Sequence, residues 1–200
     1  MSTVTPSLEG PVLEVLTRTS RPLTGREVHR LAGTGSESGV RLVLGRLVEH
    51  GLVTATQAGR ATLYVGNRDH IAWQAVEMLT GLRQALFTRL HDFATTLPVR
   101  PITLAVFGSA ARGDGDTDSD IDILAVHRSG RDDEAWTAQI DDLRDRVIAW
   151  TGNPCQIYDL TDIEFDQHVT AGEPIVDEWR VDAVTVLGTP PDQLIGMGAA

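Results

Sequence analysis

Two aspartates, Asp120 and Asp122, stand one residue apart in the otherwise apolar run 119–126. The run predicts a β-strand, and side chains two apart in a strand point to the same face, so the two carboxylates converge. Ionised side by side they repel each other, and burying them without a partner would be costly. A divalent cation is the natural counter-charge, and carboxylate oxygens at an open strand end suit Mg²⁺. The sequence therefore predicts a Mg²⁺ site on this strand.

A second apolar run, residues 102–107, also predicts a strand, and it ends at Gly108-Ser109 in a turn of small residues. A calcium loop of the EF-hand type is excluded. Such a loop, begun at Asp114, would need glycine and glutamate where Ser119 and Ala125 stand. The remaining acidic residues of this stretch are predicted to be solvated surface residues: Asp114, Asp116 and Asp118.

The combined stretch, V-F-G-S-A-A-R-G-D-G-D-T-D-S-D-I-D-I-L-A-V, resembles the nucleotidyltransferase superfamily related to DNA polymerase beta. It is most similar to the minimal nucleotidyltransferases, in which Gly-Ser is followed at this same spacing by Asp-x-Asp. The resemblance covers about residues 85–188. It implies that Gly108 and Ser109 hold nucleotide phosphate oxygens with Arg112 beside them. It also implies that Asp120 and Asp122 are catalytic residues that bind Mg²⁺.

The third predicted strand, residues 154–160, departs from the family pattern. In the family this strand supplies a third carboxylate, which helps bind the metal and can act as a base toward the attacking hydroxyl. The matching position here is Gln156, whose amide neither takes a proton nor supplies charge. The nearest carboxylate, Asp159, points to the opposite face unless a bulge turns it. Three alternatives stay open: Asp159 substitutes, two carboxylates catalyse more weakly, or the domain binds a nucleotide without catalysis.

The first seventy residues predict three short helices followed by a β-hairpin. Thr24 and Glu27 form a capping box that opens the second helix, which ends at Gly33. Ser36 is placed to cap the third helix, and Ala58-Gly59-Arg60 joins the two strands of the hairpin.

This order resembles a winged helix-turn-helix domain over about residues 8–68, a fold that inserts its third helix into the DNA major groove. The resemblance implies DNA-facing roles for Ser36, Ser38, Arg41 and Arg60. Further candidates for phosphate contacts are Arg26, Arg30 and Arg46. The alternative is a small helical module used for dimerisation or protein docking.

Between the two parts, apolar residues at helical spacing predict one long amphipathic helix over residues 75–97, closed by Pro98. The apolar face of this helix is expected either to pack on the following domain or to pair two subunits. The fold class is therefore α/β (α+β), with a small mixed sheet in the last domain. The predicted domains are 1–70 (winged helix), 71–98 (connecting helix), 99–190 (nucleotidyltransferase) and 191–200 (tail).

Composition narrows the functional classes. The chain has 200 residues and a net charge of -11, with all 17 basic residues arginine. A lysine-based Walker A loop is thus excluded, as is a protein that coats nucleic acid uniformly. The acidity lies in residues 71–200, whereas residues 1–70 carry a small positive charge. Short apolar runs exclude a membrane protein, and one cysteine without a signal peptide indicates the cytoplasm.

The leading functional prediction is a Mg²⁺-dependent nucleotidyltransferase that moves a nucleoside monophosphate from a nucleoside triphosphate, expected to be ATP, to a hydroxyl acceptor. The resemblance suggests a protein tyrosine or serine of a toxin–antitoxin partner, or a small molecule such as an aminoglycoside, as that acceptor. The alternative is a DNA-binding transcription regulator whose nucleotidyltransferase domain only senses a nucleotide. A homodimer is expected, because winged helix proteins read paired half-sites in double-stranded DNA.

Overall fold

The structure is a computed structural model, and it describes residues 7–113, 119–130 and 133–198. The chain forms two compact units, Met1–Leu82 and Arg83–Ala200, each with its own hydrophobic core. Helices and strands occur in both units, so the α+β class predicted from the sequence is confirmed. The division between the units falls inside the segment predicted as a connector.

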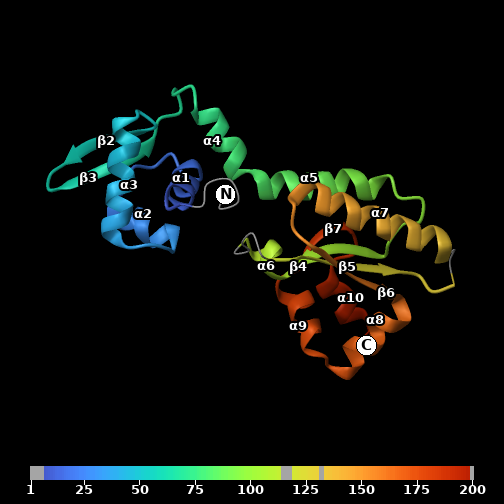
Figure 1. Cartoon of the computed structure of the whole chain (residues 1–200). Helices are drawn as coiled ribbons and strands as arrows, with labels where there is room; N and C mark the ends of the chain where they lie inside the picture. The colour runs from blue at the N-terminus through green and yellow to red at the C-terminus, as the bar shows by residue number, and fades with distance from the viewer. Residues whose placement is uncertain (1–6, 114–118, 131–132, 199–200) are drawn as a thin grey trace. The chain divides into compact units, whose positions relative to one another are not determined.

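The first unit has the element order of a winged helix-turn-helix domain (Figure 1). Its elements are α1 (Glu9–Thr17), β1 (Leu23–Thr24), α2 (Gly25–Ala32), α3 (Glu37–Glu49), β2 (Val53–Ala58), β3 (Ala61–Gly66) and α4 (Trp73–Thr80). Strand β3 pairs antiparallel with both β1 and β2. The apolar faces of the helices bury one core, which contains Val12, Leu16, Val28, Leu44 and Trp73.

The starts of α2 and α3 follow from local sequence, as predicted. The hydroxyl of Thr24 accepts the backbone N–H of Glu27 at 3.2 Å, and the Glu27 carboxylate accepts the backbone N–H of Thr24 at 2.8 Å. Ser36 accepts the N–H of Gly39 at 3.1 Å and so caps α3. These bonds satisfy amides that a helix start leaves without partners, and they fix the turn between α2 and α3.

The second unit is a four-stranded sheet between two layers of helices. Its elements are α5 (Leu82–Thr95), β4 (Thr103–Phe107), α6 (Gly108–Arg112), β5 (Ile121–His127), α7 (Asp133–Thr151), β6 (Cys155–Thr161), α8 (Asp162–Ala171), α9 (Pro174–Val181), β7 (Val184–Gly188) and α10 (Pro191–Gly198). The strand order is β6-β5-β4-β7. Only the β5–β6 pair is parallel, so the sheet is mixed as predicted.

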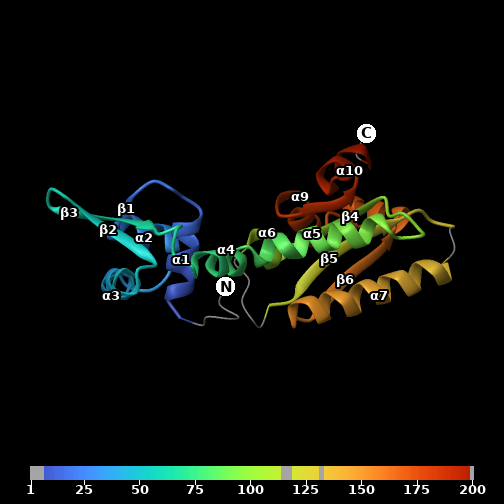
Figure 2. The same ribbon diagram turned by 90° about the horizontal axis from the view of Figure 1, so that it is seen from above.

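Alternation along β5 divides its side chains between two cores. Ile121, Ile123 and Ala125 face α5 and α7, whereas Leu124 and Val126 pack with residues of α8, α9 and α10. Figure 1 shows α5 and α7 on one side of the sheet and the last three helices on the other, and Figure 2 shows the same unit from above. The face on which a β5 side chain lies therefore decides which helices it can meet.

Three predicted elements differ from the structure. The continuous helix predicted over 75–97 is two helices, α4 and α5, interrupted at Gly81. The Thr80 hydroxyl donates to the carbonyl of Val76 at this point, and Gly81 follows it. Two residues that disfavour a helix interior therefore stand together where the helix is interrupted. The small-residue turn after β4 is the short helix α6, and the region predicted as a tail contains α10, whose Ile195 is buried against Trp179 and Phe165.

Candidate functional site

Asp122 lies near the start of β5, in the middle of the sheet. Its register partners are Phe107 at the end of β4 and Gln156 on β6. By strand alternation Asp122 is on the face of Leu124 and Val126, the side covered by α8, α9 and α10. The carboxylate thus stands at one end of the sheet, on the side of those helices.

Gly108 brings the backbone against this carboxylate. It is the first residue of α6 and has a φ of 66°, in the left-handed region that favours glycine. A Cβ atom at this position would lie 2.9 Å from Oδ2 of Asp122. Both the backbone conformation and the close approach therefore require glycine at the residue that the sequence assigned to phosphate binding.

The electrostatic setting of Asp122 is unfavourable for a lone carboxylate. Burial raises the pKa of its carboxyl, and the neighbouring charges of Asp120 and then of Glu178 raise it further. The negative charges of Asp120 and Glu178 thus act on the half-buried Asp122 carboxyl. Oxygen donors in such a setting fit a divalent cation such as Mg²⁺, which would lower the mutual repulsion.

Gln156 occupies the β6 position beside Asp122, as the sequence predicted for the position of the third carboxylate. Its Nε2 donates a hydrogen bond to Oδ2 of Asp120 at 3.3 Å. The amide therefore donates to one of the two predicted metal ligands, Asp120, and adds no negative charge to the site. A donor at this position orients Asp120, but it cannot take a proton from a substrate.

Asp159 lies on the opposite face of β6. Its Oδ1 accepts the indole N–H of Trp136 on α7 at 2.6 Å, and Nε2 of His127 lies 3.9 Å from the same oxygen. The His127 and Trp136 rings stack with centroids 4.4 Å apart. The structure does not bring Asp159 to the other predicted site residues, because β6 keeps its regular alternation through Tyr158.

The short helix α6 is fixed at its C-terminal end by two arginines. Arg83 donates through Nε to the carbonyl of Ala110 at 2.9 Å and through a terminal nitrogen to the carbonyl of Ala111. Arg112, predicted to lie beside phosphate, is ion-paired at 2.5 Å with Asp182, the C-cap residue that follows α9. Its guanidinium is half-exposed and lies one turn after Gly108. Ser109, the second residue of α6, is half-buried.

Sequence reasoning missed Glu178. The helix that carries it was predicted from Pro174, but nothing in the local pattern connects Glu178 with Asp122, which is far away along the chain. The electrostatic influence of Glu178 on Asp122 depends on how α9 packs on the sheet, and a single sequence gives no signal for it.

Part of the acidic stretch lies outside the described residues, namely Asp114, Asp116 and Asp118. Within the described residues no group of three His, Cys, Asp or Glu side chains is arranged to hold a metal ion. The same residues contain no helix long and apolar enough to cross a membrane.

In the first unit, the residues predicted to face DNA are all exposed. Ser36 and Ser38 lie at the start of α3 with their hydroxyl oxygens 3.0 Å apart. Arg41 follows on α3 and pairs with Glu37 at 2.7 Å. Arg60 is in the turn between β2 and β3. The predicted phosphate partners Arg26, Arg30 and Arg46 are exposed too, and Arg46 is ion-paired with Glu9.

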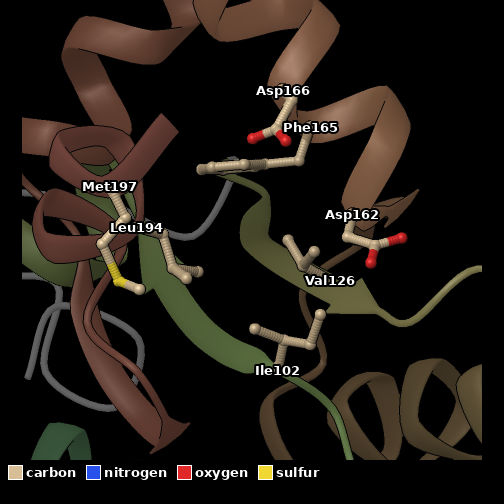
Figure 3. A pocket seen from close by; sticks show the side chains of 7 residues that line it. All are labelled: Ile102, Val126, Asp162, Phe165, Asp166, Leu194 and Met197. Carbon is tan, nitrogen blue, oxygen red and sulfur yellow. The ribbon is translucent and has the colours of Figure 1, made fainter. Parts of the chain in front are cut away.

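Figure 3 shows a separate cavity of about 220 Å³ in the second unit. Ile102 and Val126 place it at the end of β4 and β5 away from Asp122, between α8 and α10. Asp162, one of two carboxylates that line it, already accepts the backbone N–H of Ser129 at 2.8 Å. The cavity is therefore not part of the site around Gly108 and Asp122.

The class of this protein is shown by comparison with protein-family models. Residues 90–189, half of the chain, match the family model of the nucleotidyltransferase domain. The chain belongs to this family. Residues 6–98 match the model described as penicillinase repressor, in agreement with the winged helix order of the first unit. The resemblance predicted from the sequence is therefore confirmed for both parts.

The chain has only distant similarity to solved structures. No curated protein matches the chain. Among solved structures, one described as a toxin-antitoxin with AMP-PNP is 16% identical, with a TM-score of 0.37, and the match covers 56% of this chain and 83% of that one. Human N-acetylserotonin methyltransferase in complex with SAM is 17% identical, with a TM-score of 0.30, covering 44% of this chain and 28% of that one.

Proposed function

We propose that this protein is a Mg²⁺-dependent nucleotidyltransferase that moves a nucleoside monophosphate from a nucleoside triphosphate to a hydroxyl acceptor, and that its first unit binds double-stranded DNA. The observation that carries the enzymatic part is the approach of Asp122 to Gly108, with Asp120 next to it. The family match adds that this arrangement occurs in a nucleotidyltransferase domain.

In this proposal each residue has a separate task. Asp120 and Asp122 would hold Mg²⁺, which when bound offsets the negative charge of the triphosphate. The backbone at Gly108 and Ser109 allows phosphate oxygens to approach closely, because Gly108 has no side chain. Arg112 can offer a guanidinium fork to phosphate once its contact with Asp182 is exchanged. The acceptor oxygen attacks the α-phosphorus, and pyrophosphate leaves.

Calorimetric titration tests nucleotide binding directly. ATP, GTP, CTP and UTP are each titrated into the full chain with and without Mg²⁺, first with the wild type and then with Asp120→Asn/Asp122→Asn. We expect Mg²⁺-dependent binding of at least one nucleotide, with ATP the expected choice, and its loss in the double variant. Equal affinity in both proteins would contradict the assignment of the two aspartates.

DNA binding is proposed for the first unit because its segment matches the penicillinase repressor model and its exposed arginines suit phosphate contacts. Selection from a random pool of duplexes tests it, with the full chain as bait. We expect enrichment of a common sequence, and a paired, symmetric sequence would support binding as a homodimer. A pool that stays random after repeated rounds would contradict the proposal.

One observation favours a second function, namely the amide of Gln156 where a carboxylate is expected. In this reading the nucleotide is sensed rather than consumed, and the protein is a transcription regulator. Linkage then requires that nucleotide and DNA change each other's affinity by the same factor. Reciprocal coupling without pyrophosphate release would support the regulator, whereas pyrophosphate release would support the enzyme.

A further inference from the structure

Transfer to a hydroxyl requires a group that accepts the hydroxyl proton, and the described site lacks one at the expected position. Gln156 carries an amide, which does not take up a proton near neutral pH. Asp159 is on the opposite face of β6, where it accepts a hydrogen bond from Trp136. Asp120 and Asp122 are assigned to the cation. The proton acceptor must therefore come from another element.

Helix α9 covers the site end of the sheet. Trp179 is 1% exposed, and its ring packs edge-on against Phe107 and Tyr158 with centroids 6.4 and 6.2 Å apart. Phe107 directly precedes Gly108 and is the register partner of Asp122. The buried side of α9 thus rests on the strand positions next to the site, and Glu178, the residue before Trp179, is exposed at its margin.

A second contact links the C-terminal ends of α6 and α9. Arg112 and Asp182 form an ion pair at the C-terminal ends of the two helices. Gly108 lies one turn before Arg112, and Glu178 lies one turn before Asp182, with the Asp182 N–H bonded to the Glu178 carbonyl at 2.9 Å. Residues four apart share a helix face, so Glu178 lies on the face of α9 that carries the ion pair with α6.

The electrostatics agree with this placement. Asp122 lies against Gly108, and the charge of Glu178 is one of the influences that raise the pKa of the Asp122 carboxyl. Packing and ion pairing therefore place α9 beside the site, and the influence of the Glu178 charge on Asp122 agrees with a Glu178 carboxylate on the side where α9 borders it.

We propose that Glu178 is the catalytic base of this protein and that α9 supplies the carboxylate that β6 lacks at position 156. This inference rests on the proposed nucleotidyl transfer. The acceptor hydroxyl oxygen forms a bond to the α-phosphorus of the nucleoside triphosphate, and the bond between that phosphorus and the β-phosphate oxygen breaks. Pyrophosphate leaves with that electron pair, and the hydroxyl proton passes to a carboxylate oxygen of Glu178.

The test compares Glu178→Gln with Asp177→Asn in the full chain. Both variants remove one negative charge from adjacent exposed positions of α9. Asp177 pairs with Arg180 at 2.7 Å on the helix surface and is not part of the site, so its variant controls for charge and helix stability. Pyrophosphate release is measured with saturating Mg²⁺ and the best-bound nucleotide, with a soluble protein extract held constant as the source of acceptor.

We expect Glu178→Gln to lower the rate about 100-fold or more, which is typical for loss of a general base. Its affinity for Mg²⁺-nucleotide should stay the same or rise, because a negative charge near the triphosphate is removed. Asp177→Asn should behave as wild type. Glu178→Asp should recover part of the rate, since it retains a carboxylate on a shorter side chain.

Two results would overturn the inference, and only one of them would also overturn the proposed nucleotidyl transfer. If Glu178→Gln releases pyrophosphate within threefold of the wild type, Glu178 is not the base, while the proposed transfer stands. If the wild type binds Mg²⁺-nucleotide but releases no pyrophosphate, the proposed transfer fails and the role of Glu178 fails with it.

Discussion

Replacing Gly108 by alanine separates backbone strain from damage to the candidate site. The φ of 66° is unfavourable for any residue with a Cβ, by about 1–2 kcal/mol. The new methyl group would also lie 2.9 Å from Oδ2 of Asp122, closer than such atoms pack. Either the Asp122 carboxylate or the start of α6 must move. We therefore expect both a loss of stability and weaker Mg²⁺-nucleotide binding.

Gly113 offers a matched control for this prediction. It has a φ of 81°, so alanine there carries a similar backbone strain. Its Cβ would be 3.5 Å from the Arg83 side chain, an ordinary contact. The loss of unfolding free energy in Gly113→Ala should therefore equal the part of the loss in Gly108→Ala that comes from backbone strain. Gly113→Ala should not displace a carboxylate.

Urea unfolding and calorimetric titration measure the two effects. Gly113→Ala should lower the free energy of unfolding by about 1–2 kcal/mol, and Gly108→Ala by at least as much. Only Gly108→Ala should weaken Mg²⁺-nucleotide binding, by about 10–100-fold, the range seen when the surroundings of a metal ligand are disturbed. If Gly108→Ala binds as tightly as Gly113→Ala, the contact between Gly108 and Asp122 does not form part of the site, and the reasoning is refuted.

Three further predictions concern the rest of the chain. Hydrogen bonds from the Thr24 backbone N–H lower the pKa of Glu27 to about 2 from 4.5, so its contribution to stability is complete above pH 4.5 and lost as the pH falls through 2. Unfolding curves of Glu27→Gln should show less acid sensitivity in that range, and an unchanged pH dependence would contradict this. If Arg60 contacts phosphate, Arg60→Ala should reduce the slope of log DNA affinity against log salt concentration by about one. An unchanged slope in a filter-binding titration would exclude the contact. Asp159→Ala should cost about 1–3 kcal/mol by leaving the Trp136 N–H without its acceptor, yet keep nucleotide affinity, and a loss of affinity in calorimetry would return Asp159 to the site.

The sequence was sufficient wherever the cause is local. The capping box of Thr24 and Glu27, the Ser36 cap and the hairpin between β2 and β3 depend on residues a few positions apart. The spacing of Asp120 and Asp122 places the two charges near each other, although Asp120 lies just before β5 and only Asp122 is in the strand. The resemblance implied Gln156 as the position of the third carboxylate, whereas its pairing with Asp122 is set by the parallel register of β5 and β6, which is not a local effect.

The sequence was insufficient where distant segments meet. Strand β1 contains only Leu23 and Thr24, and it exists because these residues pair with Leu63 and Tyr64 of the hairpin. The break at Gly81 is not visible in the apolar spacing, which continues across it. Glu178 comes near Asp122 through the packing of Trp179 on Phe107, which no pattern within α9 indicates.

The most direct test of the central claim follows the phosphate that is transferred. The full chain is incubated with Mg²⁺, a soluble protein extract and ATP labelled with ³²P at either the α or the γ position, beside Asp120→Asn/Asp122→Asn. Nucleotidyl transfer predicts that label from the α position, and not from the γ position, appears on an acceptor together with released pyrophosphate, and that the double variant does neither. Label transferred from the γ position, or α label transferred equally by the double variant, would contradict the account.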